Sequence, residues 1–196
     1  MGICRRSVFA AAGLAAGLAV IPLAGAAVAG EIADHAVDAE NLLQQDKPAE
    51  ALDAFDKSTD AFWAASPLQL RTVLFADSVQ GYGQYRPRSD SVFKVGDTAT
   101  IYAEPFGYGF TASGDEFQAT FKAGIEVTTP GGLVLAKSDD FGRLRWMGRT
   151  RSRAVHVAID VELPDLRPGE YRLNVALTDD ATGKASMATL PFTIAE

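Results

Sequence analysis

Few side chains in this 196-residue sequence have the types and spacing that catalysis requires. Two histidines, His35 and His156, are the only imidazole bases, and no G-x-S-x-G segment accompanies them. His156 lies on the polar face of a predicted strand with Asp160 and Glu162, as any solvent-facing histidine would. We therefore favour a surface position for His156 and expect a protein that is not an enzyme.

Residues with metal-binding chemistry are equally sparse. His35, Asp34 and Asp38 place nitrogen and oxygen ligands near one helical turn, but neither H-E-x-x-H nor an EF-hand loop is present. An acidic helix start, which the helix dipole stabilises, is the favoured interpretation of this cluster. One cysteine and three methionines are too few for a cysteine-based zinc site or a thioether copper site. We expect no metal and no cofactor.

Three acidic residues, Glu104, Asp115 and Glu116, border predicted loops. Two carboxylates that face each other across a cleft are the machinery of glycoside hydrolysis. These residues therefore support one alternative function, a polysaccharide hydrolase, although every acidic protein offers similar choices.

Two glycine-rich segments concentrate aromatic side chains: Gly81-Tyr82-Gly83-Gln84-Tyr85 and Glu104-Pro105-Phe106-Gly107-Tyr108-Gly109-Phe110. Rings on loops at one end of a domain form stacking platforms for ligands such as sugars. The favoured alternative is that these rings cap the core or pack on a neighbouring helix pair. If the segments do bind, the residues expected to make contact are Tyr82, Tyr85, Phe106 and Tyr108.

Five arginines within eleven residues surround Trp146: Arg143, Arg145, Arg149, Arg151 and Arg153. In an extended chain the last three point the same way, toward the rim of the predicted sheet. Guanidinium groups bind phosphate or uronate groups and acidic partners. Pairing with the protein's own acidic residues is an equally weighted alternative. We add the five arginines to the predicted contact surface.

Helical periodicity covers the segment from Glu31 to about Ala65. Pro48 follows a break in the pattern and predicts the first turn of a second helix, so the segment forms an antiparallel hairpin. The positions expected to be buried are Ile32, Ala36, Ala39, Leu43, Ala51 or Leu52, Phe55, Thr59 and Phe62. Residues 39–55, A-x-x-L-L-x-Q-D-K-P-A-E-A-L-x-A-F, resemble part of a tetratricopeptide repeat. A single repeat has no neighbour to stack on, so we expect this hairpin to cover the next domain or to form a homodimer.

From Leu68 onward the apolar period changes to two, and the residues from Glu116 to Val127 alternate strictly. Seven or eight short strands separated by glycine, proline and aspartate turns predict an antiparallel β-sandwich. The run from Leu163 to Ala185, L-P-D-L-R-P-G-E-Y-R-L-N-V-A-L-T-D-D-A-T-G-K-A, resembles the closing hairpin of an immunoglobulin-like or fibronectin-type-III-like domain, and Phe93 to Pro105 is similar to its early strands. The resemblance implies a tyrosine corner, in which the Tyr171 hydroxyl bonds to the backbone around Leu166. It implies a fold and no particular activity.

The first 29 residues have the order of an export signal peptide. Arg5 and Arg6 precede an apolar stretch that is shorter than a membrane span, and small residues mark cleavage after Ala29. The segment from Arg5 to Phe9 resembles a twin-arginine export motif, and the general secretory route is weighted equally. We expect a periplasmic or secreted protein whose mature chain does not span the membrane.

The chain carries 18 basic and 25 acidic residues, a net charge of −7. Removal of the signal leaves 16 basic and 25 acidic residues, a net charge of −9, which argues against a nucleic-acid partner. The expected organisation is a signal peptide over 1–29, a helical hairpin over 30–66 and an immunoglobulin-like β-sandwich over 67–196. The expected function is a non-catalytic binding or accessory protein of the bacterial envelope, with a glycan, anionic ligand or protein as partner. The alternatives are the hydrolase and a purely structural spacer that dimerises.

Overall fold

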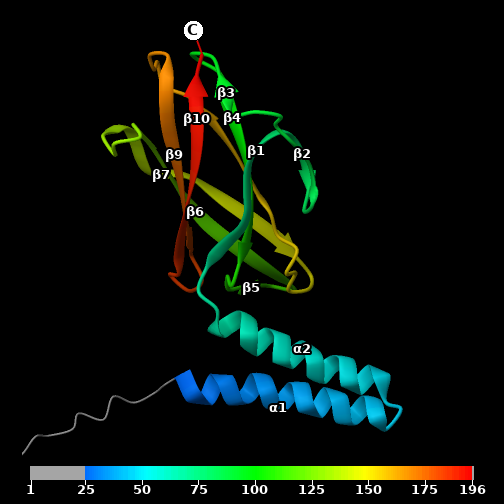
Figure 1. Ribbon diagram of the computed structural model, residues 1–196. Coiled ribbons are helices and arrows are strands. Elements are labelled where there is room, and N and C mark those ends of the chain that lie inside the picture. The colour runs from blue at the N-terminus through cyan, green and yellow to red at the C-terminus, as the bar shows by residue number, and fades with distance from the viewer. Residues whose placement is uncertain (1–24, 196) are drawn as a thin grey trace, which may run out of the picture.

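The computed structural model describes residues 25–195, in which two antiparallel helices lie at one end of a β-sandwich (Figure 1). The helices are α1 (Gly25–Gln44) and α2 (Pro48–Ala65). The predicted fold class, mainly β with a helical hairpin before the sandwich, is confirmed. Arg5 and Arg6 of the predicted signal lie outside the described residues, and α1 includes Ala29, after which we predict cleavage.

One sheet of the sandwich has four strands in the order β2-β1-β4-β8, and every pairing in it is antiparallel. These strands are β1 (Gln69–Gly81), β2 (Gln84–Pro87), β4 (Thr98–Phe106) and β8 (Val157–Glu162).

The second sheet has the order β3-β10-β9-β6, with β3 parallel to β10 and the other strands antiparallel. A further strand, β7, pairs along the other side of β6, and the short β5 pairs with the start of β6. These strands are β3 (Val92–Phe93), β5 (Thr111–Ser113), β6 (Glu116–Thr128), β7 (Val134–Gly148), β9 (Gly169–Asp179) and β10 (Ala185–Ile194).

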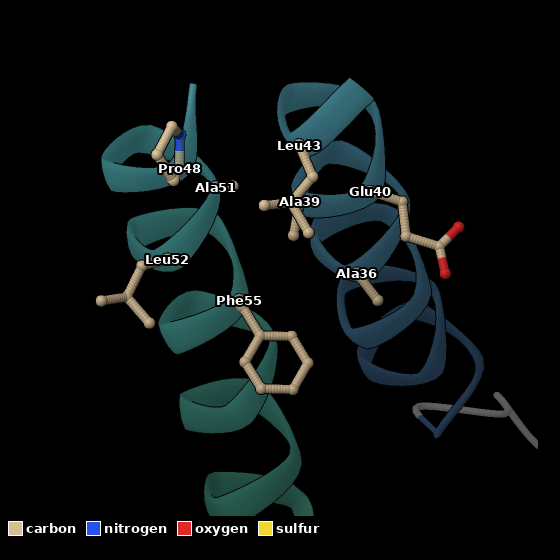
Figure 2. A pocket seen from close by; sticks show the side chains of 8 residues that line it. All are labelled: Ala36, Ala39, Glu40, Leu43, Pro48, Ala51, Leu52 and Phe55. Atoms are coloured by element: carbon tan, nitrogen blue, oxygen red, sulfur yellow. The ribbon is translucent and has the colours of Figure 1, made fainter. Parts of the chain in front are cut away.

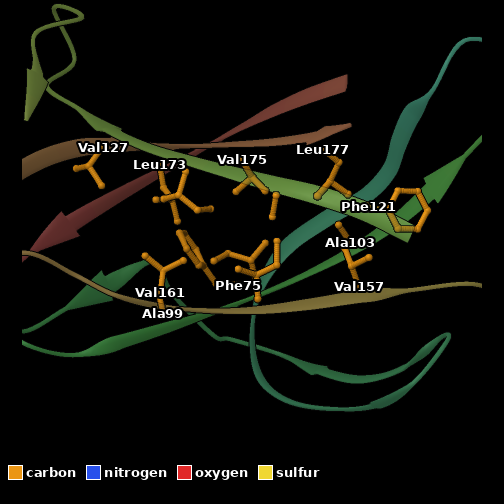
Figure 3. Close-up of a cluster of buried hydrophobic side chains, with 14 of the residues drawn as sticks. Phe75, Ala99, Ala103, Phe121, Val127, Val157, Val161, Leu173, Val175 and Leu177 are labelled. Carbon is orange, nitrogen blue, oxygen red and sulfur yellow. The ribbon is translucent and has the colours of Figure 1, made fainter. Parts of the chain in front are cut away.

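The hydrophobic core lies between the two sheets and follows the alternation in the sequence (Figure 3). Along β6, β8 and β9 every second side chain is buried, including Phe121, Ile159 and Val175. The hydroxyl of Tyr171 donates a hydrogen bond of 2.8 Å to the carbonyl of Arg167, one residue from the position that the tyrosine corner implied. The second sheet is thereby joined to the turn before β9.

One strand is longer than the sequence predicts, and one of the two aromatic segments lies in a hairpin. The predicted strand ending at Lys137 continues as β7 to Gly148, because β6 provides a hydrogen-bonding partner over nearly its whole length. Arg143 and Arg145 therefore lie on a strand. The aromatic segment 81–85 forms the turn and start of the β1–β2 hairpin.

The two helices pack through small side chains. Their buried residues are Ala39 on α1 and Ala51, Ala54 and Ser58 on α2, and the Ser58 hydroxyl donates a hydrogen bond of 2.7 Å to the carbonyl of Ile32. These small side chains allow the two helices to approach closely, and the larger apolar side chains lie on either side of the contact. Of the alternatives Ala51 and Leu52, Ala51 is the buried one. The prediction of burial is wrong for Leu43, Phe55 and Phe62, which are 50–60% exposed. Within residues 25–195, neither helix has the length and apolar character that a membrane crossing requires.

Candidate functional site

A pocket of about 360 Å³ lies where the end of α2 meets the sandwich. We call it the junction pocket. Its wall is built from segments far apart in the sequence: the last turns of α2, the loop after β4, the start of β6, the segment after β7 and the β9–β10 turn. The residues that matter for its chemistry are Asp60, Trp63, Phe110, Phe117, Arg151 and Lys184.

The loop after β4 approaches other backbone closely at two glycines. Gly107 has a φ of +80°, and a Cβ at this position would collide with the carbonyl of Pro67. A Cβ at Gly109 would lie 2.6 Å from the Thr182 methyl carbon. Only glycine fits these contacts, so the loop is pressed between the α2–β1 connection and the β9–β10 turn.

Asp179, a buried carboxylate at the end of β9, holds this loop in place. It accepts hydrogen bonds from the backbone N–H of Gly109 at 2.7 Å, from the Thr182 hydroxyl and from the backbone N–H of Ala181 at 3.2 Å. A carboxylate can be buried at tolerable cost when several donors satisfy it. The sequence indicated only a turn here, and the role of Asp179 in positioning the loop was missed.

Lys184 joins the helix to the sandwich. Its ammonium group donates hydrogen bonds to three carbonyl oxygens, those of Ala64 at 2.8 Å, Ser66 at 2.6 Å and Gly107 at 3.2 Å. A positive charge at the C-terminus of α2 also interacts favourably with the helix dipole. Lys184 therefore fixes the end of α2 against the loop that forms the pocket wall.

Trp63 provides the aromatic contact between helix and sandwich. Its indole N–H donates a hydrogen bond of 2.8 Å to the carbonyl of Tyr108. Its ring packs edge-to-face on Phe106 and Tyr108, with centroids 4.6 and 5.1 Å apart. Sequence reasoning missed Trp63 as a site residue, although a tryptophan just before the Ser66-Pro67 helix stop is the signal that would have indicated it.

The structure separates the four aromatic residues of the predicted contact surface. Tyr108 is 2% exposed and donates a hydrogen bond of 2.7 Å to the carbonyl of Ser152, so most of its ring is engaged in packing, although it also contributes to the wall of the junction pocket. Burial raises the pKa of its phenol. Phe106 packs on Trp63 and Phe62. Both rings therefore pack against the neighbouring helix pair, as the alternative interpretation of the aromatic segments expected, because α2 covers the loop.

Tyr82 and Tyr85 belong to the β1–β2 hairpin, outside the wall of the junction pocket. The ring of Tyr85 stacks on Tyr102 with centroids 4.1 Å apart, while Tyr82 is 37% exposed at the turn. Beneath them the Tyr102 hydroxyl donates to Glu104 at 2.7 Å and accepts from the backbone N–H of Gly83 at 2.8 Å. This cluster pins the hairpin to the outer face of its own sheet.

Three of the five arginines pair with the protein's own acidic residues. Arg153 lies 2.6 Å from Asp60 and 3.7 Å from Asp56, both on α2. Arg143 lies 2.8 Å from Asp180. Arg151 is held only loosely by Asp60, at 3.9 Å, and its side chain is 57% exposed. Arg153 thus holds α2 against the sandwich, while Arg151 remains partly available.

The remaining two arginines, Arg145 and Arg149, are exposed, and neither makes an ion pair within the described part of the chain. Neither of them lines the junction pocket.

The loop carboxylates of the hydrolase alternative are not brought into a described pocket. Glu104 accepts hydrogen bonds from Tyr102 and, at 3.2 Å, from Thr72, whereas Asp115 and Glu116 lie at the β5–β6 turn. Among residues 25–195 no group of three or more histidine, cysteine or acidic side chains is arranged to hold a metal ion.

No known family model matches the chain, and no curated protein matches its sequence. Among solved structures, the chain is similar to the C-terminal domain of Wzt, with 14% identity over 67% of this chain and 75% of that one and a TM-score of 0.39. It is also similar to CopC from Methylosinus trichosporium OB3b, with 12% identity over 63% and 93% and a TM-score of 0.30. An AA10 lytic polysaccharide monooxygenase from Streptomyces lividans gives 19% identity over 56% and 61% and a TM-score of 0.33. Likenesses of this size carry no statement about function.

Proposed function

We propose that this chain is an exported, non-catalytic binding protein of the bacterial envelope that holds a uronate unit of an acidic glycan in the junction pocket. The observation that carries the proposal is the meeting of Trp63, Phe110, Phe117 and Arg151 in one pocket from four separate segments. Export rests on the sequence of residues 1–29 alone.

The aromatic residues supply a surface for the sugar ring. Trp63, Phe110 and Phe117 are half-buried, so each stays partly accessible to solvent. Trp63 and Phe110 are also packed against the core. The C–H face of a pyranose packs well on aromatic rings. Because the protein already holds these side chains in place, binding costs little side-chain entropy. A volume of about 360 Å³ is at the lower end of ligand pockets and fits a ligand of one or two rings.

Arg151 supplies the preference for an acid. The Arg151 guanidinium lies over the face of the Phe117 ring, with its central carbon 5.6 Å from the ring centroid, so the cation forms part of the same pocket wall as the aromatic rings. Because the Asp60 carboxylate is 3.9 Å away, most of the N–H donors of Arg151 remain unused. A bidentate pair with the carboxylate of a uronate uses those donors. The ionisable residues that line the pocket, Arg151, Lys184 and Asp60, sum to one positive charge in a protein that is acidic overall.

The test is a calorimetric titration of the purified protein with trigalacturonate and with the neutral galactotriose. We expect binding of the acidic trimer in preference to the neutral one. Arg151→Ala should weaken binding of the acidic trimer about tenfold, or about 1.4 kcal/mol, because a charge-assisted pair is lost.

Arg145→Ala is the matched control, since it removes an exposed arginine of the same cluster that lies outside the pocket wall. Equal affinity for the two trimers, or equal loss in the two variants, would contradict the proposal. Release of reducing ends from an acidic polysaccharide, abolished by Glu104→Gln, would favour the hydrolase instead.

A further inference from the structure

Helix α1 is held by very little buried surface. Among residues 30–44 only Ala39 is buried, and the buried residues of α2 are equally small. Most of the stability of a protein helix comes from packing of its apolar face against the rest of the protein. The contacts within one chain therefore leave α1 poorly supported.

The apolar residues that would support it line a groove along one face of the hairpin (Figure 2). The groove has a volume of about 490 Å³, with Ala36 and Leu43 on α1 and Leu52 and Phe55 on α2. Leu43, Leu52 and Phe55 are 60%, 60% and 56% exposed. Large side chains half in solvent along a continuous helix face are the mark of an interaction surface.

Charge is distributed so that this face can meet a copy of itself. Glu40 is the only ionisable residue among those that line the groove. The acidic residues Asp38, Glu50 and Asp53 line the opposite face of the hairpin instead. A second hairpin can therefore cover the groove without bringing the acidic faces of the two copies together.

The size of the face also suits a second copy. The 18 residues of α2 span about 27 Å at the rise of an α-helix. Two packed helices are about 20 Å wide, from an interaxial distance of 8–10 Å and one helix diameter. The face thus projects about 500 Å² on each copy, so two copies together reach the roughly 1,000 Å² expected of a biological interface.

We propose that two chains associate through this groove, with the two hairpins related by a twofold axis and forming a four-helix bundle. In such an isologous interface each copy contributes the same residues, so Leu52 and Phe55 of both chains enter one apolar core. The proposal does not depend on the junction pocket or on its ligand.

The test is the mass in solution of the full chain, expressed with its own N-terminal segment, by light scattering and sedimentation at about 100 μM, a concentration well above the Kd of a standard-size interface. We expect the wild type to have twice the mass of one chain. Leu52→Asp should halve that mass, because it buries a carboxylate at the centre of the interface.

Leu133→Asp is the matched control, since Leu133 is 66% exposed at the turn between β6 and β7 and should leave the mass unchanged. Circular dichroism establishes that both variants keep the sandwich. A monomeric wild type at this concentration would overturn the proposal whatever the variants do. If the Leu52→Asp protein remained a dimer, this face would not be the interface.

Discussion

Tyr102 shows how a single side chain on the outer face of the sheet comes to be buried. Its ring is covered by Tyr85 and by His156, with centroids 4.1 and 5.8 Å away. Burial, the largest cause, together with the hydrogen bond and negative charge of Glu104 raises the pKa of Tyr102 to about 12 from its ordinary 10.0. The folded state thus binds the phenol proton more tightly than the unfolded state.

This pKa predicts a loss of stability in alkali. Because the folded-state value is above the unfolded one, the contribution of Tyr102 is complete below pH 10 and is lost as the pH rises toward 12. Chemical denaturation between pH 9 and 12 should show the free energy of unfolding falling with pH. Tyr102→Phe should make that fall shallower, and Tyr108 should account for part of what remains. An unchanged slope in Tyr102→Phe would contradict this account.

At the scale of elements, the attachment of α2 to the sandwich rests on few groups. The lysine at position 184 satisfies two carbonyls near the end of the helix and one in the loop after β4, and Trp63 packs over the same loop. Arg153 pairs with Asp60 one helical turn earlier. These contacts, rather than a broad apolar interface, position α2 over the pocket.

Lys184→Met is therefore expected to lower the free energy of unfolding by about 2 kcal/mol, since hydrogen bonds to a charged group are lost while the apolar stem is kept. Thermal and urea denaturation measure the change. Lys122→Met is the control, because Lys122 is half-buried on β6 and its side chain makes no hydrogen bond within the described residues. Equal stability of the two variants would contradict the role assigned to Lys184.

The elements themselves follow from sequence where the signal is local. Alternation along β6, β8 and β9 predicts strand and inward face together, and Pro48 predicts the start of α2. The length of β7 does not follow, because its pairing with β6 is a tertiary contact that local propensity cannot show. Burial in the hairpin was predicted correctly for Ala39 and Ala51 but not for the larger Leu43, Phe55 and Phe62, because small residues occupy the helix contact and the larger ones lie beside it.

Across the whole molecule, opposite charges bring the two regions together. The helical hairpin, with nine acidic and two basic residues over 30–66, carries most of the net negative charge. The arginine segment after β7 lies against it through Arg151 and Arg153. The sequence showed both charge clusters but could not show which arginines would be neutralised. Distances to Asp60 decide this, and they single out Arg151 as the exposed and loosely paired member that lines the pocket.

The measurement that tests the central claim most directly is the fluorescence of Trp63 during titration with trigalacturonate. The chain has two tryptophans, so Trp146→Phe leaves Trp63 as the only reporter. We predict a saturable change in Trp63 emission, shifted to about tenfold higher ligand concentration when Arg151→Ala is added to the same background. Unchanged Trp63 emission, while calorimetry shows that the acidic trimer binds, would place the ligand elsewhere and contradict the account.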